Sequence, residues 1–335
     1  MSWYNEIGNS FDTVLSSRIR FARNIAGFPF SSRLKDEDAK TIISSVFETF
    51  EEKGFKKIDF SDISPLDASS YVEKHLVSRE FAAKKTPHAL LLSESTGTAI
   101  MLCEEDHVRL QSIFPGLALE EAYRVACEYD DVLGSALEIS YDEELGYLTV
   151  CPTNLGTGMR ASVMMFLPAI TMAGGIRDLA SQLSKIGLTM RGMYGEGSES
   201  GGCLYQISNQ ITLGITEEET LKKLSEVIDQ ISDRERKLRT SLKGNDLDTI
   251  RDRIMRSEGA LKYAHMMSSS EFMQHFSNVR LGISMGIITD ISYVTLGSLF
   301  VDTLPATLTK SESLKGSSER ERDLARAKLI RARLL

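Results

Sequence analysis

Arginines at several separate points of the chain stand where they could bind phosphate. Arg18 and Arg20 are two residues apart, so both side chains lie on one face if the segment is extended. Arg160 follows Gly156-Thr157-Gly158-Met159, and Arg191 opens another glycine-containing segment. Guanidinium groups match phosphate bidentately, and glycines let backbone N–H groups approach closely. Each arginine taken alone is more typical of a solvated or salt-bridged surface residue, so the spacing by itself indicates no more than an anion site.

The common nucleotide-binding signatures are missing. The sequence contains no GxxxxGK[ST] motif, no GxGxxG opening a βαβ unit, and no HRD or DFG pair. An anion site built from these arginines therefore belongs to a different class of nucleotide-binding protein, or to none.

Five segments, in order along the chain, carry a resemblance to a known family. They are Val14–Arg20, Glu104–Arg109, Cys151–Ser162, Arg191–Gly197 and Gln206–Gln210. On these segments, the chain from about Val14 to Gly214 resembles the catalytic domain of the phosphagen (ATP:guanidino) kinases, and most closely the bacterial protein-arginine kinases. The first segment begins at residue 14, so we expect the small helical domain that precedes this domain in the free-metabolite kinases to be missing.

The resemblance implies an ATP site in which arginines clamp the phosphates and His75 contacts the adenosine part. By residue type alone, His75 is more often a packing or helix-surface residue. The expected nucleotide-binding residues are Ser16, Ser17, Arg18, Ile19, Arg20, His75, Arg109, Arg160, Ala161, Ser162, Val163, Met164, Arg191, Gly192, Met193, Tyr194, Gly195 and Glu196. Mg²⁺ is expected to bridge the phosphates, held mostly by phosphate and water; no structural metal site is expected.

The resemblance also implies the acceptor chemistry. An arginine side chain is protonated at neutral pH and becomes a nucleophile only when a proton leaves, so a carboxylate must take that proton and hold the planar group. Glu105 matches the catalytic base, Glu196 a second carboxylate, and Cys151 a reactive cysteine that orients the guanidinium. Glu104 and Asp106 are expected to support Glu105. Without the resemblance, the acidic run is typical of a solvated turn, and a lone cysteine is typical of an inert thiol.

Near the C-terminus, Arg322-Asp323-Leu324-Ala325-Arg326-Ala327 matches an RDxxRA motif of the protein-arginine kinases. The resemblance implies that Arg322, Asp323, Arg326 and Ala327 bind phosphoarginine. Residues four apart share a helix face, so Arg322 and Arg326 are expected to fork one phosphate. The alternative is an ordinary charged amphipathic helix.

These residues need elements to position them. Ala89–Leu92 and Thr98–Leu102 predict a hairpin, and Leu145–Val150 and Leu204–Leu213 predict strands. Helices are expected over 36–53, 119–129, 161–172 and 176–186, and Thr216 with Glu219 predicts a capping box that opens a helix through about Leu242.

The expected fold class is α+β: an antiparallel sheet flanked by helices, of the glutamine-synthetase-like phosphagen-kinase kind, followed by an all-helical C-terminal domain. We place the catalytic domain at 1–240 and a helical phosphoarginine-binding domain at 241–335, with a break at Gly244-Asn245.

Composition limits the alternatives. The 335 residues hold 39 Lys plus Arg against 47 Asp plus Glu, a net charge of −8, which disfavours general nucleic-acid binding. Apolar residues make up 42% and charged residues 26%, as in ordinary globular proteins. The longest apolar stretch, 161–176, is broken by Pro168 and two glycines, and the first residues do not have the pattern of a signal peptide. Four cysteines without a CxxC pair favour a reducing cytoplasm.

Together these features predict an ATP-dependent kinase that phosphorylates arginine side chains of proteins. The resemblance implies that it marks proteins for a Clp unfoldase–protease, acts on a stress repressor, is stimulated by a zinc-binding activator protein, and forms a homodimer or larger assembly; nucleic acid and membrane are not expected partners. Two alternatives stay open: a phosphagen kinase for free arginine or another small guanidine, and an inactive phosphoarginine-binding adaptor. Cys203, beside Gly201-Gly202, departs from the family's usual residue, with an effect that the sequence leaves open.

Overall fold

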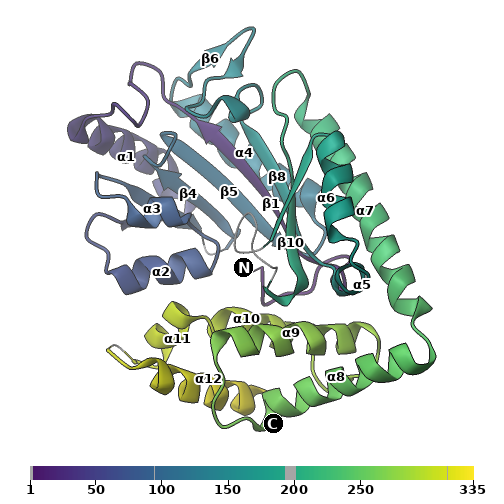
Figure 1. Ribbon diagram of the computed structural model, residues 1–335. Helices are drawn as coiled ribbons and strands as arrows, with labels where there is room; N and C mark the ends of the chain where they lie inside the picture. The colour runs from purple at the N-terminus through teal and green to yellow at the C-terminus, as the bar shows by residue number, and fades with distance from the viewer. Residues whose placement is uncertain (1–2, 94, 193–200, 315) are drawn as a thin grey trace.

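The chain consists of a body that contains both strands and helices and of a helical C-terminal part (Figure 1). The structure, a computed structural model, describes residues 3–93, 95–192, 201–314 and 316–335. The body contains one large sheet with helices packed on it, and the C-terminal part lies across one end of that sheet. The expected α+β fold class is confirmed.

The large sheet has eight strands in the order β2-β3-β4-β5-β1-β8-β10-β9, and every neighbouring pair is antiparallel. The strands are β1 Val14–Arg23, β2 Lys56–Asp59, β3 Ala89–Ser93, β4 Thr98–Leu102, β5 Val108–Pro115, β8 Met159–Phe166, β9 Leu188–Gly192 and β10 Leu204–Asn209. A small separate hairpin pairs β6 Tyr141–Asp142 with β7 Gly146–Tyr147. The expected hairpin of β3 and β4 is present.

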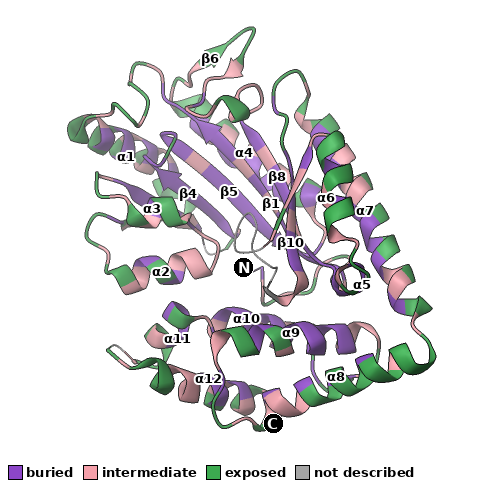
Figure 2. Cartoon of the chain, in the orientation of Figure 1, coloured by how far each residue is buried: buried purple, intermediate pink, exposed green. Residues whose placement is uncertain are grey.

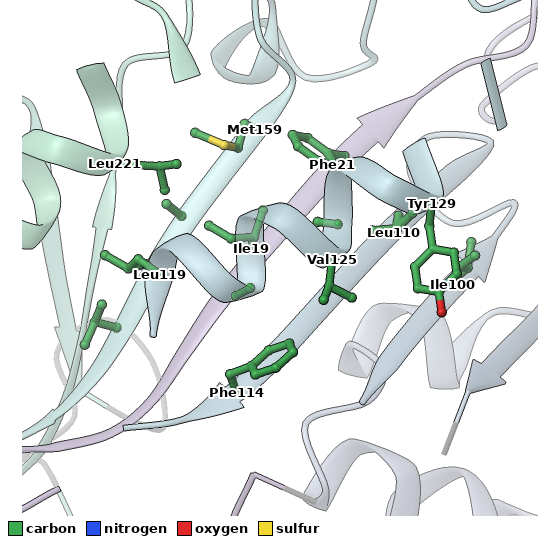
Figure 3. Close-up of a cluster of buried hydrophobic side chains, with 14 of the residues drawn as sticks. Ile19, Phe21, Ile100, Leu110, Phe114, Leu119, Val125, Tyr129, Met159 and Leu221 are labelled. Atoms are coloured by element: carbon green, nitrogen blue, oxygen red, sulfur yellow. The ribbon is translucent and has the colours of Figure 1, made fainter. Parts of the chain in front are cut away.

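One face of this sheet is an apolar core. Successive residues of a strand point to opposite faces, and on β1 the side chains of Ile19 and Phe21 enter the core while Arg18 and Arg20 face away from it. The core is covered by α1 Asp36–Phe50, α4 Leu119–Ala136, α6 Ile176–Lys185 and α7 Glu217–Ser241. Figure 3 shows α4 crossing the strands, with Val125 and Leu119 near Ile19. Figure 2 shows the central strands as the most continuously buried part of the body.

The predicted helix over 161–172 is wrong in its first half. Residues Met159–Phe166 form the central strand β8, and the helix α5 covers Pro168–Met172 alone. Ala, Met and Phe suit a buried helix as well as a buried strand, so the apolar run did not distinguish them. Pairing with β1 on one side and β10 on the other decides for the strand, and Pro168 then suits the first position of a helix.

Other boundaries differ by smaller amounts. The strand expected over 145–150 is reduced to β7, the strand expected over 204–213 ends at Asn209, and α4 continues to Ala136. The helix expected over 36–53 ends as α1 at Phe50 and continues as a 3₁₀ turn over Glu51–Lys53. Two further 3₁₀ turns cover Pro152–Asn154 and Gly201–Cys203.

The C-terminal helices pack on one another and on the sheet, around a core that also contains Leu15, Ile113, Phe166 and Leu204 of the body. These helices are α8 Gly244–Tyr263, α9 Ser269–Ser284, α10 Tyr293–Asp302, α11 Pro305–Ser311 and α12 Glu319–Leu334. Their buried faces meet around Ile254, Phe276, Leu299, Phe300 and Ile330. Capping boxes open α7, α9 and α12, and the one predicted at Thr216 and Glu219 is present. In the described ranges, no helix is long and apolar enough to cross a membrane.

A buried charge network fastens α7 to the sheet. Both carboxylate oxygens of Glu235 accept 2.9 Å bonds from the backbone N–H groups of Ala169 and Ile170, at the start of α5. Arg239 donates to Glu235 at 2.8 Å and pairs with Asp12 just before β1. A fully buried carboxylate is stable only when paired and hydrogen-bonded in this way. The network fixes the ends of β1 and β8, the two strands that carry Arg18, Arg20 and Arg160.

Shortening Ile19 to alanine tests the contribution of the core beneath the arginines. Ile19 is fully buried, so Ile19→Ala should lower the free energy of unfolding by about 2–5 kcal/mol. The matched control is Ile7→Ala, because the side chain of Ile7 is 62% exposed and should contribute little. Urea unfolding followed by circular dichroism measures both variants. Equal stabilities would contradict the assigned packing.

Candidate active site

The face of the sheet opposite the core gathers the expected phosphate-binding arginines. Strand register places Arg20 opposite Arg160 of β8, and Ala22 opposite Arg109 of β5. Arg18 lies on β1 two residues before Arg20, so its side chain is on the same face. Arg191 lies on β9 opposite Gln206 of β10. Residues directly opposite one another on antiparallel strands share a face, so five separate sequence segments converge on one surface.

Neutral side chains hold two of these arginines. Arg18 donates from Nη2 to Gln206 Oε1 at 3.1 Å, and Arg160 donates from Nη2 to Ser208 Oγ at 3.0 Å. Within the described part of the chain, the buried Nε atoms of Arg20 and Arg160 have no hydrogen-bond partner. Buried donors without partners are costly and need an explanation. Two such donors on a positively charged face fit a phosphate-bearing ligand.

Burial, together with the crowding of positive charge, lowers the pKa of three of these arginines. Burial first, and then the charges of Arg160 and Arg109, lower the pKa of Arg18 to about 10. Burial first, and then the charges of Arg18 and Arg160, lower the pKa of Arg20 well below its ordinary value. The pKa of Arg160 is lowered by burial and by the charges of Arg191 and Arg109. A polyanion would relieve this repulsion, because an opposite charge favours the charged form.

The turn before β5 brings carboxylates beside the arginines. Glu105 accepts from Arg109 Nη2 at 2.8 Å, and Glu104 pairs with the same guanidinium and accepts from Ser78. The Glu105 side chain is 43% exposed, whereas that of Glu104 is 6% exposed. Glu105 is therefore the carboxylate of this pair that an incoming substrate can reach.

Asp106 joins the Glu105 turn to the Cys151 loop. Its side chain is fully buried, and its Oδ1 accepts from Asn24 Nδ2 and from the backbone N–H of Val150, both at 2.8 Å. The next residue is Cys151, whose Sγ lies 3.0 Å from Thr153 Oγ1. Asp106 thus positions the loop that carries the thiol, and its own carboxylate is closed off from solvent.

One pocket contains the side chains that could take part in a reaction. Its walls include Glu105, Cys151, Arg20, Arg109 and Arg160. The expected base, the expected reactive cysteine and three of the arginines expected to bind phosphate therefore face the same space. Glu196, the expected second carboxylate, lies outside the described residues, as do Met193, Tyr194 and Gly195.

A second pocket adjoins the first along β1 and contains His75. It is lined by Trp3, Ser16, Arg18, His75, Ile113, Ser162, Met164 and Gln206. Rings of Trp3 and His75 meet edge to face with centroids 5.5 Å apart. Burial, with a smaller contribution from the Arg18 charge, lowers the pKa of His75 to about 4, so the ring is neutral at pH 7. A neutral, partly aromatic pocket thus lies beside the row of arginines, next to Arg18.

Some expected nucleotide-binding residues point elsewhere. Ile19, Ala161 and Val163 are fully buried in the core on the opposite face, where their side chains cannot contact a ligand on the arginine side. Ser17 is also on that face, where it donates to Gly116 O at 2.9 Å. Gly192 is opposite Tyr205 and follows Arg191 directly, so it lies on the face away from the arginines. The expectation covered whole segments, whereas a strand offers every second side chain to one face.

Four residues that contact the site were given no role from the sequence, although two of them belong to the matching segment Gln206–Gln210: Gln206, Ser208, Trp3 and Asn24. Gln206 and Ser208 alternate on β10, and polar residues two apart within an apolar strand are a signal that could have found them. Trp3 enters the pocket from far away in sequence, which no local pattern reveals.

The RDxxRA segment does not form the expected fork. The Arg326 side chain is 2% exposed, and it donates to Thr303 O at 2.9 Å, to Met267 O at 2.8 Å and to Asp323 at 2.5 Å. Arg322 is only partly buried and donates to Ser317 O at 2.8 Å. Arg326 is thus turned into the helical core, where Ala327 is also buried. The two guanidinium groups do not face one shared phosphate.

Comparisons with known proteins agree with the fold. The profile of the family described as ATP:guanido phosphotransferase, C-terminal catalytic domain, matches residues 38–238, and that of the protein-arginine kinase McsB C-terminal domain matches 247–335. A protein-arginine kinase from Clostridium kluyveri is 43% identical, with 99% of this chain and 98% of the relative covered. One from Halothermothrix orenii is 43% identical, covering 99% and 96%.

Solved structures of more distant proteins share the fold. A taurocyamine kinase from Schistosoma mansoni, substrate-free, is 21% identical with a TM-score of 0.62, covering 79% of this chain and 42% of that one. A lombricine kinase is 21% identical with a TM-score of 0.61, covering 73% and 72%.

The chain belongs to the ATP:guanido phosphotransferase family. Its full-length relatives and the matching C-terminal domain narrow this to the protein-arginine kinases of the McsB type, enzymes that transfer phosphate from ATP to arginine in proteins.

The neutral state of His75 can be tested by titration. Because the folded pKa is about 4 and an unfolded histidine titrates near 6.5, the unfolded chain binds the extra proton between these values, and this group favours folding less as pH falls through that window. In the folded protein, the His75 ring signal, assigned by its loss in His75→Gln, should not titrate between pH 8 and 5.5. NMR of ring-labelled protein measures this, and the urea-unfolded chain is the control. A folded-state midpoint near 6.5 would contradict the burial of this ring.

Proposed function

We propose that the arginine face binds the phosphates of ATP and that Glu105 is the catalytic base for an arginine side chain of a protein substrate. The observation that carries the proposal is the single pocket shared by Glu105, Cys151 and three arginines. Arg18, Arg20, Arg109, Arg160 and Arg191 would stabilise the charge that spreads over the transferred phosphoryl group. Ser16, Ser162, Met164 and His75 would line the side that receives the nucleoside.

The reaction places a specific demand on the carboxylate. A guanidinium nitrogen of the acceptor must lose a proton as it attacks the γ-phosphorus, and the bond from that phosphorus to the bridging oxygen of ADP breaks. Glu105 would accept the proton, and its partial exposure lets it reach an acceptor on another protein. Cys151 would orient the same guanidinium, and Glu196 is proposed to hold it from a second side.

Mg²⁺ is proposed to reach the site with the nucleotide. In the ranges that the structure describes, no group of three or more His, Cys, Asp or Glu side chains could hold a metal ion. Mg²⁺ is commonly bound through substrate phosphates and water, and here it would supply neutralisation of phosphate charge. The chain's own contribution is the arginine face that holds those phosphates.

We also propose the division into a catalytic domain over 1–240 and a phosphoarginine-binding domain over 241–335. The end of α7 at Ser241, the start of α8 at Gly244 and the packing of the later helices on one another support it. In the second domain, Arg322 would contact the phosphate, while Asp323, Arg326 and Ala327 hold its helix in place.

The wider role follows from the family and is proposed on that basis. The enzyme would act in the cytoplasm as a homodimer or larger assembly, mark proteins for a Clp unfoldase–protease, act on a stress repressor and respond to a zinc-binding activator protein. The site itself supports the step that all of these share, which is phosphorylation of a protein-borne arginine.

Replacing the proposed base tests the mechanism directly. Glu105→Ala should reduce formation of acid-labile phosphoarginine on an unfolded protein by about 10²–10⁴-fold, because the proton has no acceptor. Glu121→Ala is the matched control, since Glu121 is an exposed glutamate on α4, across the sheet from the site. The assay uses ATP·Mg²⁺ and mass spectrometry, with free arginine as a parallel acceptor.

Three outcomes would contradict the proposal. Unchanged product with Glu105→Ala would exclude this residue as the base. Turnover with free arginine alone would favour a small-guanidine kinase. Binding of phosphorylated protein without any turnover would favour an inactive adaptor.

The two arginines of α12 should differ when replaced. Arg322→Ala should weaken binding of a phosphoarginine peptide by about tenfold or more while leaving the melting temperature nearly unchanged, because a charged hydrogen bond contributes about 1.5–3 kcal/mol. Arg326→Ala should instead lower the melting temperature, since it leaves buried carbonyls and Asp323 without their donor. Isothermal titration calorimetry and thermal unfolding measure the two effects. Equal loss of stability in both variants would contradict the division of roles.

A further inference from the structure

Glu73 connects the C-terminal helices to the His75 pocket. It is the last residue of α2 (Pro65–Glu73), two positions before His75. Its Oε1 accepts from the backbone N–H of Ala306 at 2.8 Å, and its Oε2 accepts from Thr307 N at 2.7 Å and Thr307 Oγ1 at 2.8 Å. These hydrogen bonds join the catalytic body to the first turn of α11, and Figure 1 shows α2 and α11 as neighbours.

The contact replaces a cap that α11 does not supply for itself. The residue before α11 is Leu304, which has no side chain that could accept from the first turn. The first N–H groups of a helix need acceptors, and a carboxylate at this end is favoured by both hydrogen bonding and the helix dipole. Ala306 and Thr307 are buried, so water is a poor substitute for Glu73. The bond therefore fixes α2 relative to α11.

His75 depends on where α2 ends. Its backbone has φ +60°, which an L-residue adopts at a cost of about 1 kcal/mol or more unless its surroundings hold it. His75 N–H bonds Val72 O at 2.9 Å, and Leu76 N–H bonds Tyr71 O at 3.1 Å, so the turn is built on the last turn of α2. Gln111 holds the far side by donating to His75 O at 2.8 Å and Leu76 O at 3.0 Å.

Trp3 forms a second connection between the C-terminal helices and the His75 pocket, through α10. Trp3 packs edge to face on His75 and on Phe300 of α10, with centroids 6.4 Å apart in the second pair. Trp3 also donates to Lys74 O at 3.3 Å. Gly297 of α10 lies so close to Tyr4 that a Cβ there would be 2.4 Å from Tyr4 O. The C-terminal helices thus hold both aromatic walls of the pocket.

We propose that Glu73 is a positioning residue for nucleotide binding, through which the C-terminal helices set the place of His75. The inference rests on the proposed role of His75 at the adenosine part of ATP. Glu73 itself does not line the pocket, so it would act on nucleotide affinity and leave the phosphoryl-transfer step unchanged.

The test separates KM from kcat. Glu73→Ala should raise the KM for ATP about five- to tenfold and leave kcat at saturating ATP within about twofold, since the loss falls on binding and not on the reacting groups. Lys310→Ala is the matched control, because Lys310 joins the same two helices through a more exposed 2.6 Å ion pair with Asp67. Its KM should equal that of the wild type. All assays use the full chain with a protein acceptor.

Further variants keep the inference decidable. Thr307→Val removes one of the three donors and should raise the KM for ATP less than Glu73→Ala does, which covers the case that Glu73→Ala does not fold. An unchanged KM in the Glu73 and Thr307 variants, or a loss of kcat without a change in KM, would overturn the inference. His75→Ala distinguishes the two proposals: a raised KM there with a normal KM in Glu73→Ala refutes the role of Glu73 alone. An unchanged KM in His75→Ala refutes the assigned role of His75, and the inference with it.

Discussion

The concentration of like charge on one face of a sheet is the constraint on which the site depends. Arg18, Arg20 and Arg160 occupy neighbouring positions of β1 and β8, and their charges and burial together lower their pKa values. The arrangement is held by the apolar core on the other face, where Ile19 and Phe21 alternate with the arginines. Gln206 and Ser208 fix the guanidinium groups without neutralising them, so the charge remains for an incoming phosphate.

The acidic residues of the site divide into distinct tasks because their surroundings differ. Glu104 is buried and paired with Arg109, and Asp106 is buried and bound to Asn24 and Val150, so both are held by the fold. Glu105, between them, extends toward solvent. Along this short turn, buried and exposed carboxylates alternate. The exposed one lies where a cationic acceptor can arrive, and its two neighbours are held as fixed supports. Removal of either support would leave a buried partner unsatisfied.

The sequence could predict what depends on local pattern. The shared face of Arg18 and Arg20, the hairpin of β3 and β4 and the capping box at Thr216 all follow from spacing within a few residues. The strand β8 could not be recognised, because its apolar run suits either element until β1 and β10 pair with it. The inward turn of Arg326 was hidden for the same reason, since its acceptors, Thr303 and Met267, are carbonyls of distant segments. The cap that Glu73 provides to α11 is likewise a product of tertiary contact alone.

The helical part of the chain is therefore structurally continuous with the catalytic body. Arg326 of α12 donates to Thr303 O, two residues before Pro305 opens α11, and α11 is capped by Glu73 of the body. Each link is a buried or charge-assisted hydrogen bond, which is the kind that resists exchange with water. A change at any one of these bonds must be absorbed by the short segment between Thr303 and Thr307, because packed helices shift as units and do not deform smoothly. The position of α2, and with it the His75 turn, is thus determined from both parts of the chain.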